Sequence, residues 1–199
     1  MIEHAAGVIL AGGKSSRFGA NKALALHQGV PLVQRIADCL APLFPETLLV
    51  TNTPEDYAFL AWPMTADRFP HCGPLAGIHA ALAVIGQPAA FVCACDTPLV
   101  EPALVRFLCA QLADNEVVLP WLANGPEPLY AVYSRAALPA IEAALLRGEL
   151  RLNSLCRQLR SRRVSEEEIL ALLPDLSTFH NINRRHDLTA IAGHGGRDV

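Results

Sequence analysis

Short apolar runs, separated by longer segments of helical periodicity, constrain the fold of this chain more than any other feature. Most of the runs lack the polar alternation of a half-exposed strand, which is typical of strands buried on both faces of a parallel sheet. Each run therefore predicts a buried strand. The predicted strands are residues 7–11, 47–51, 91–95, 117–121 and 129–133.

Helical periodicity predicts helices at 32–43, 76–85, 103–113, 136–146 and 153–159. Ser165 and Glu168 have the spacing of a capping box at the start of a further helix. Alternating strands and helices predict a single-domain α/β fold, with a mostly parallel, Rossmann-like sheet flanked by helices and joined by right-handed crossovers. No linker divides the 199 residues, so we expect one domain over 1–192 and a flexible tail over 193–199.

Composition excludes several classes of protein. Hydrophobic residues make up 52% of the chain and charged residues 18%, which excludes a disordered chain or a coiled-coil rod. The formal charge of −3 argues against general binding of nucleic acid. The uncharged stretch between Phe69 and Cys95 is interrupted by glycines and prolines, so it does not predict a membrane span. The N-terminus lacks the pattern of a signal peptide, and we expect a cytoplasmic protein.

The six cysteines are expected to be reduced thiols, because a chain of this length does not need disulfides to hold its core together. Cys93 and Cys95 form the only close pair, and that spacing alone is a weak zinc signal. Buried thiols that pack as small apolar side chains are the simpler interpretation.

A glycine-rich segment with several cations follows the first predicted strand. Gly12 and Gly13 allow the backbone to turn sharply and to approach a ligand closely. The N–H groups of such a turn can cradle anionic oxygens, and Arg17 and Lys22 could hold a triphosphate. Between residues 4 and 37 there are four basic residues and no acidic one. The segment therefore indicates an anion site, although an ordinary glycine-rich surface turn remains the alternative.

Two commoner phosphate-binding motifs do not fit this segment. A P-loop that ends in Gly13-Lys14-Ser15 needs a glycine at position 8. That position is Val8, and Gly7 misses it by one residue. The dinucleotide-binding pattern G-x-G-x-x-G does not occur.

A carboxylate, Asp96, directly follows the strand predicted at 91–95. This places it at the carboxyl edge of the sheet, where open α/β sheets bind ligands. A carboxylate that faces a phosphate cradle is suited to Mg²⁺, which takes hard oxygen donors and bridges phosphates. The alternative is that Asp96 merely caps the helix that begins near Pro102.

Asn52 and Asp67 lie near the same predicted edge. They could contact a base or a sugar hydroxyl, or they could be turn residues. Gly73 and Gly77 flank a helix start whose N–H groups could face a nucleotide, although a plain loop-to-helix turn explains them nearly as well.

Asn181 and Asn183 share one face if their segment is extended, so they could bind a polar ring or a phosphate, or close a turn. A group of arginines precedes them and is opposed within its own segment only by Glu149. These side chains could attract a second anionic substrate or nucleic acid, or form a solvated face. The arginines are 147, 151, 157, 160, 162 and 163.

Four segments together closely resemble the motifs of the molybdenum cofactor guanylyltransferase family of nucleotidyltransferases, in the same order. They are Leu10-Ala11-Gly12-Gly13-x-Ser15-x-Arg17-x-Gly19-x-x-Lys22, Gly73-Pro74-Leu75-Ala76-Gly77, Cys95-Asp96-Thr97-Pro98 and Asn181-Ile182-Asn183. The resemblance covers residues 7 to about 188. The chain departs from it at Phe18, where methionine is usual, and at Asn21, where an acidic residue is usual.

The resemblance implies a sheet of the nucleotide-diphospho-sugar transferase type and a transfer of GMP from GTP to the terminal phosphate of molybdopterin, with release of pyrophosphate. It implies Mg²⁺ as the cofactor, with Asp96 as its ligand, and Arg17, Lys22 and Asp96 as the catalytic residues. The implied nucleotide-binding residues are Leu10, Ala11, Gly12, Gly13, Lys22, Asn52, Asp67 and Asp96. The implied pterin-binding residues are Asn181, Asn183 and Arg151.

GTP and molybdopterin are thus the expected small-molecule partners. Other proteins of molybdenum cofactor biosynthesis and acceptor molybdoenzymes are the expected protein partners of a monomer. A cytidylyltransferase acting on the same pterin, or on another phosphorylated acceptor, is the nearest alternative. A nucleotide-binding regulatory module without catalysis is an alternative from another class.

Overall fold

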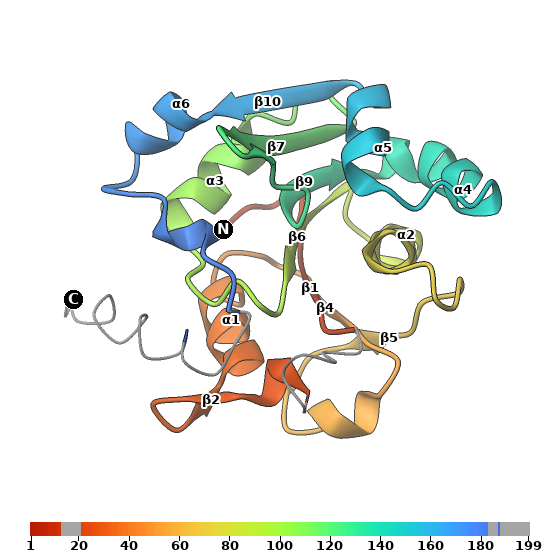
Figure 1. The fold of residues 1–199 in the computed structure, drawn as a ribbon. Helices are drawn as coiled ribbons and strands as arrows, with labels where there is room; N and C mark the ends of the chain where they lie inside the picture. Colours follow the sequence, from red (N-terminus) through yellow and green to blue (C-terminus); the bar gives the residue numbers. More distant parts are fainter. Residues whose placement is uncertain (13–20, 183–186, 188–199) are drawn as a thin grey trace.

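The computed structural model describes residues 1–12, 21–182 and 187. An eight-stranded sheet runs through the molecule in the order β10-β7-β9-β6-β1-β4-β5, and β8 pairs with β7 beside this path (Figure 1). The strands are β1 (Ala6–Leu10), β4 (Thr47–Val50), β5 (Met64–Thr65), β6 (Ala89–Ala94), β7 (Val117–Leu122), β8 (Gly125–Pro126), β9 (Tyr130–Ser134) and β10 (Ser161–Ser165). A separate hairpin joins β2 (Leu26–His27) to β3 (Val30–Pro31).

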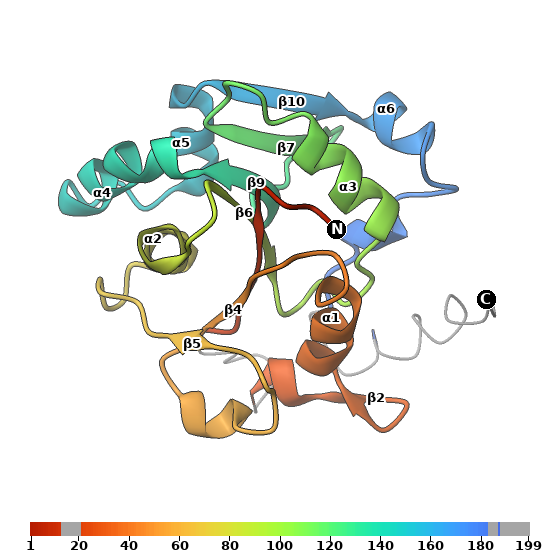
Figure 2. The same ribbon diagram turned by 180° about the vertical axis from the view of Figure 1, so that it is seen from behind.

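Helices cover both faces of this sheet. They are α1 (Leu32–Leu40), α2 (Pro74–Val84), α3 (Pro102–Ala110), α4 (Leu138–Leu146), α5 (Leu152–Gln158) and α6 (Glu166–Leu170). The core forms one apolar cluster on each face: α1, α3 and α6 contribute to the first, and α2, α4 and α5 to the second. Figures 1 and 2 show the two sets of helices on opposite sides of the strands. The layers are those of a Rossmann-like α/β domain, as predicted.

Each predicted strand is present, with its ends shifted by at most two residues. β1 pairs in parallel with β4 and β6, β5 with β4, and β10 with β7, so the sheet is mostly parallel. β9 runs antiparallel to both β6 and β7, and the short β8 also pairs antiparallel with β7. β9 is buried from Tyr130 to Tyr133 on both faces, which is why its apolar run resembles that of a parallel strand.

The predicted helices are also present, and most are shorter than predicted at one end. α1 ends at Leu40 and α3 at Ala110, each three residues before the predicted end. α2 begins two residues earlier than predicted, at Pro74, because Gly73 adopts a φ of +66° that reverses the chain ahead of the helix. The first residues predicted for α4 instead form a 3₁₀ turn, Arg135–Ala137.

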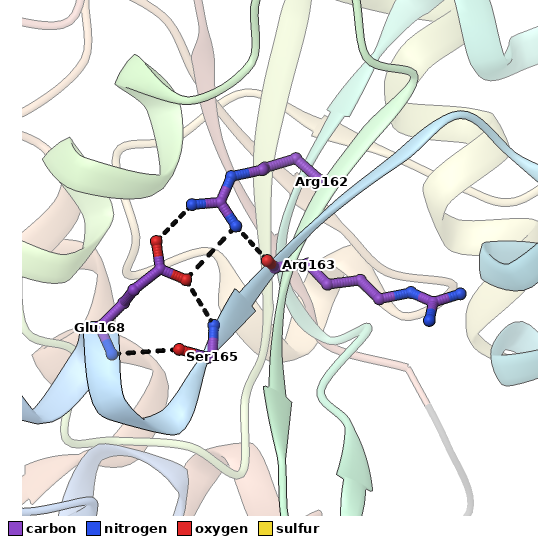
Figure 3. Close-up of polar contacts among 4 residues, drawn as sticks. All are labelled: Arg162, Arg163, Ser165 and Glu168. Carbon is purple, nitrogen blue, oxygen red and sulfur yellow. Dashed lines mark hydrogen bonds and ion pairs between the residues drawn. The ribbon is translucent and has the colours of Figure 1, made fainter.

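The predicted capping box at the start of α6 is present (Figure 3). The Ser165 hydroxyl accepts a hydrogen bond from the Glu168 N–H at 3.2 Å, and the Glu168 carboxylate accepts one from the Ser165 N–H at 2.9 Å. The same carboxylate also binds the guanidinium of Arg162 on β10. Glu168 therefore joins the strand to the helix that follows it.

The arginines between 147 and 163 are more fully opposed by acidic groups than their own segment indicates. Arg160 lies 3.8 Å from Glu116, and Arg162 pairs with Glu168. The fold supplies these partners from outside the segment: Glu116 lies just before β7, and Glu168 lies on α6. Two further arginines stack on the ring of Trp121. These are Arg157 and Arg163.

All six cysteines are free thiols, as expected. In the described part of the chain, no cluster of three or more potential metal-binding His, Cys, Asp or Glu side chains occurs, so Cys93 and Cys95 do not belong to one there. None of the described helices has the length and apolarity that a membrane crossing requires.

Candidate active site

Three parallel strands end together at one edge of the sheet. Leu10, the last residue of β1, is in register with the last residues of β4 and β6. The pairing continues just past the strands, since the Ala11 N–H donates to the Val50 carbonyl at 2.9 Å and the Cys95 N–H donates to the Leu10 carbonyl at 3.2 Å. The segments that follow β1 and β6 thus leave the sheet side by side, at the edge where α/β sheets bind ligands.

Lys22 and Asp96 meet at this edge. The Lys22 Nζ atom lies 3.2 Å from Asp96 Oδ2, although the residues are 74 positions apart in the chain. Lys22 belongs to a short 3₁₀ turn, η1 (Lys22–Leu24), and its side chain is 9% exposed; that of Asp96, just past β6, is 31% exposed. The end of the glycine-rich segment, at Lys22, therefore lies next to Asp96, as predicted.

This ion pair suits an anionic ligand that brings a cation with it. Removing two charges from water opposes their attraction, so a half-buried pair contributes little to folding by itself. In a site for a metal–triphosphate, the ammonium can turn to phosphate oxygens and the carboxylate to the cation. The pair thus supplies both signs of charge that such a ligand needs.

Asn52 and Asp67, after β4 and β5, are brought together at the neighbouring part of the edge. The Asn52 Nδ2 atom donates to Asp67 Oδ2 at 2.7 Å, and the Asp67 N–H donates to Asn52 Oδ1 at 3.1 Å. Asn52 is exposed and Asp67 is partly buried. The two bonds hold the Asn52 amide against Asp67 at this part of the edge.

Leu10 and Ala11 are buried, so their side chains belong to the core at this edge and do not face solvent. Leu10 packs against the first turns of α2, and a Cβ atom built on Gly77 would lie 3.2 Å from Leu10 Cδ2. Glycine at this position lets α2 approach the end of β1 closely. Gly12 is the exposed residue that follows, the last described one before the gap.

The last of the four motifs, at Asn181 and Ile182, lies directly against Asp96. The Ile182 N–H donates to the Asp96 carbonyl at 3.0 Å, and the Thr97 hydroxyl donates to Asn181 Oδ1 at 3.1 Å. Asn181 is exposed beside the site. Its motif and that of Asp96 are about eighty residues apart, and the fold makes them neighbours.

Arg151 lies elsewhere. It precedes α5, is exposed, and lines a surface depression of about 540 Å³ with Arg157 and three other residues of α5. None of the described contacts joins Arg151 to Lys22 or Asp96. Gly13, Arg17 and Asn183 fall outside the described residues, as do the proposed domain end at 192 and the tail at 193–199.

Glu127 is a site residue that the sequence analysis missed. It lies in the turn between β8 and β9, and two residues on, the Leu129 carbonyl accepts a hydrogen bond from the Ala94 N–H at 3.2 Å. Burial, and then the negative charge of Asp96, raise the pKa of the Glu127 carboxyl above its usual value. β6 therefore ends with the β1 edge on one side and the Glu127 turn on the other. A single glutamate between two prolines resembles an ordinary turn, so no sequence signal could have singled it out.

Residues 7–164 match the family model of the MobA-like NTP transferase domain. The chain is 40% identical over 186 residues to a molybdenum cofactor guanylyltransferase from Desulfosudis oleivorans, covering 92% of this chain and 91% of the relative. Its fold is similar to that of molybdopterin-guanine dinucleotide biosynthesis protein A from Archaeoglobus fulgidus, with a TM-score of 0.83, 26% identity, and coverage of 93% and 95%. It also shares the fold of Rv0371C from Mycobacterium tuberculosis, solved as a manganese complex, at 16% identity and a TM-score of 0.61, with coverage of 87% and 100%.

The fold and the family match define this protein as a nucleotidyltransferase enzyme. Within that class, the chain belongs to the molybdenum cofactor guanylyltransferase family, because the similarity to named members extends over nearly its whole length. The family resemblance that the four motifs indicate is thereby confirmed.

Proposed function

We propose that this protein transfers GMP from GTP to the phosphate of molybdopterin, forming molybdopterin guanine dinucleotide and releasing pyrophosphate. The observation that carries the proposal is the Lys22–Asp96 pair, 3.2 Å apart at the carboxyl edge of the sheet. Open α/β sheets bind ligands at this edge, so the pair is available there to a triphosphate and a divalent cation.

In the proposed reaction, an oxygen of the pterin phosphate forms a bond to the α-phosphorus of GTP. The bond from that phosphorus to the bridging oxygen of pyrophosphate breaks, and its electron pair leaves with pyrophosphate. Such chemistry depends on positioning and charge neutralisation more than on protein acids and bases. Lys22 neutralises charge on the departing phosphates, and Arg17 and the backbone of Gly12 and Gly13 have the same role by family resemblance.

Mg²⁺ is the proposed cofactor. Mg²⁺ is usually held by one or two carboxylates together with substrate phosphates and water, so a site with few protein ligands suits it. Asp96 provides a partly exposed carboxylate of this kind. When bound, the ion supplies charge neutralisation at the phosphate oxygens. Asp96 would hold the ion, and Lys22 would then be able to bind the phosphates.

The two sides of Asp96 divide the substrates in this proposal. Asn52 and Asp67, beside the β4 end, bind guanine and ribose, with Leu10, Ala11 and Gly12 beneath them. The pterin lies on the other side, at the Glu127 turn, and Asn181 lies next to Asp96 through Thr97. Asn183 belongs to the proposed pterin side by family resemblance. The same resemblance implies Arg151, but this residue lies elsewhere, just before α5, and has no part in this arrangement. We further propose a cytoplasmic monomer that interacts with proteins of cofactor biosynthesis and acceptor molybdoenzymes.

An assay with each of the four nucleoside triphosphates, Mg²⁺ and molybdopterin tests the proposal, with the dinucleotide product and pyrophosphate both measured. We expect product from GTP and little from the others. A preference for CTP would make the protein a cytidylyltransferase. Nucleotide binding without pyrophosphate release would make it a binding module. Either result overturns the proposed function.

A further inference from the structure

The hydroxyl of Tyr57 joins the two described ends of the glycine-rich segment. Tyr57 Oη lies 3.4 Å from the carbonyl oxygen of Ala11, to which it donates, and it accepts a hydrogen bond from Asn21 Nδ2 at 3.0 Å. Ala11 is the residue after β1, and Asn21 immediately precedes Lys22. One buried oxygen therefore contacts the chain at Ala11, just after β1, and again at Asn21, just before Lys22.

Asn21 also contacts the turn that contains Lys22. Its Oδ1 atom accepts a hydrogen bond from the Ala23 N–H at 3.2 Å and so caps η1, the turn that contains Lys22. Its Nδ2 atom also lies 3.3 Å from Asp56 Oδ2. A three-residue 3₁₀ turn has almost no stability of its own, because so few hydrogen bonds offset the ordering of its backbone. Its side-chain anchors therefore determine its position.

Tyr57 is suited to act as such an anchor. It ends a second short turn, η2 (Pro54–Tyr57), between β4 and β5, and it is 1% exposed. Burial raises the pKa of Tyr57 to about 12, so the hydroxyl keeps its proton at neutral pH and can donate to Ala11. The residue lies beneath the site and takes no part in lining it.

We propose that Tyr57 and Asn21 are positioning residues that hold Lys22 in place for the triphosphate of the nucleotide. A lysine side chain loses rotamer freedom when it is fixed. Anchoring its backbone in advance reduces the ordering that must occur on binding. This inference rests on the proposed function, since it gives Lys22 the triphosphate as its ligand.

A double-mutant cycle tests whether Tyr57 acts through Lys22. The four proteins compared are the wild type, Tyr57→Phe, Lys22→Ala and the double variant. The Kd of the nucleotide with Mg²⁺ is measured by calorimetry, and kcat in the transfer assay. We expect Tyr57→Phe to raise Kd roughly tenfold, a size that matches the loss of one or two hydrogen bonds. In the Lys22→Ala background, the same change should have little further effect, because the residue it positions is gone.

Tyr130→Phe is the matched control. Tyr130 is also buried, in the same core cluster, and its hydroxyl accepts a hydrogen bond from the Glu101 N–H at 3.1 Å at the start of α3. The control should lower Tm by about as much as Tyr57→Phe, yet leave Kd and kcat unchanged. Equal effects of the two variants on Kd would overturn the inference, as would a Tyr57→Phe effect that is undiminished without Lys22.

Two substitutions at Asn21 add a rescue. In Asn21→Ser, the hydroxyl can still accept from the Ala23 N–H and cap η1, whereas Asn21→Ala removes the cap. We expect the serine variant to bind nucleotide more tightly than the alanine variant, and equal affinities would contradict the inference. The cycle uses whichever nucleoside triphosphate the wild type binds best, so an error in the guanine assignment leaves the test intact. Binding of no triphosphate would overturn the inference together with the proposed function.

Discussion

At the scale of single residues, the site combines groups that sequence separates widely. Lys22 and Asp96 each belong to a motif that can be recognised alone. Their motifs predict that the two residues lie close together, and in the structure they are 3.2 Å apart. Tyr57 and Glu127 belong to no such motif. In the sequence, Tyr57 resembles an ordinary core residue and Glu127 resembles an ordinary turn residue. Only the folded structure reveals their position beside the site.

Glu127→Gln tests the acceptor side of the proposed site. We expect the KM for molybdopterin to rise several-fold, with the affinity for GTP unchanged, because the turn lies on the side of β6 away from β1. Steady-state kinetics with each substrate varied in turn measures both. Glu149→Gln, in an exposed turn paired with Arg147, is the control and should change neither value. A rise in the KM for GTP alone would place Glu127 on the nucleotide side.

The raised pKa of Glu127 also predicts the pH dependence of its contribution to stability. Because the folded-state pKa lies above the unfolded value, ionisation of this carboxyl opposes folding, and its favourable contribution is lost as the pH rises through the folded pKa. Glu127→Gln should therefore be more stable than the wild type at pH 7. The difference should shrink as the pH falls below the ordinary value of 4.5. Urea unfolding at several pH values measures it, and a variant less stable at pH 7 would contradict the interpretation.

Gly12→Ala separates a ligand contact from a structural need. Among the described residues, no atom lies within 4 Å of a Cβ built on Gly12, and its backbone does not need glycine's conformational freedom. We expect the variant to keep the wild-type Tm, within about a degree, since exposed substitutions of this kind have small effects. Its affinity for GTP should fall roughly tenfold, because the added methyl group lies where the backbone approaches the phosphates. Unchanged affinity, by calorimetry, would remove Gly12 from the site.

At the scale of elements, the part of the chain most poorly predicted is the edge around β10. Its segment carries two arginines in five residues, and only Val164 is buried, so apolar periodicity could not identify a strand. The capping box that follows it was predicted, because Ser165 and Glu168 are close in sequence. Figure 3 shows how Glu168 joins both elements, through the Ser165 N–H and the Arg162 guanidinium.

Two substitutions at Glu168 distinguish its two contacts. Glu168→Ala removes the capping box and the ion pair, and should lower the free energy of unfolding by about 1 kcal/mol at pH 7. Glu168→Gln keeps the cap and should lose only a part of that, since exposed ion pairs contribute little. The hydrogen bond from Arg162 is the main reason that the pKa of Glu168 is lowered.

The lowered pKa gives a second signature. The stabilisation from Glu168 is present above the unfolded pKa, near 4.5, and is lost as the pH falls through the lower folded value. Urea unfolding between pH 7 and pH 3 should show this acid-side loss in the wild type and a smaller one in Glu168→Gln. Identical pH profiles would show that the contact contributes nothing in solution.

At the scale of the whole molecule, the class of fold follows from the sequence because every central strand is buried on both faces. β1, β4 and β6 have apolar runs that no exposed strand would carry, and they form the middle of the sheet. The direction of a strand is less predictable. β9 is as apolar as its neighbours, and its antiparallel pairing depends on the short β8 turn before it.

The candidate site was predicted as far as local motifs reach. The sheet edge places Asp96 beside the segment that follows β1 because parallel strands end together, and this follows once the strands are assigned. Pairings between distant polar residues, such as Tyr57 with Ala11, depend on how loops fold over that edge. Periodicity and spacing carry no information on such contacts.

The central claim is that Asp96 and Lys22 form the site of a metal-bound triphosphate, and Asp96→Asn tests it most directly. The rate of pyrophosphate release is measured with GTP and molybdopterin over a range of Mg²⁺ concentrations. Losing the metal-binding carboxylate should lower the rate by about a hundredfold or more and require far more Mg²⁺ for half-maximal rate. A variant that releases pyrophosphate within about twofold of the wild type, at the same Mg²⁺ requirement, would contradict the account.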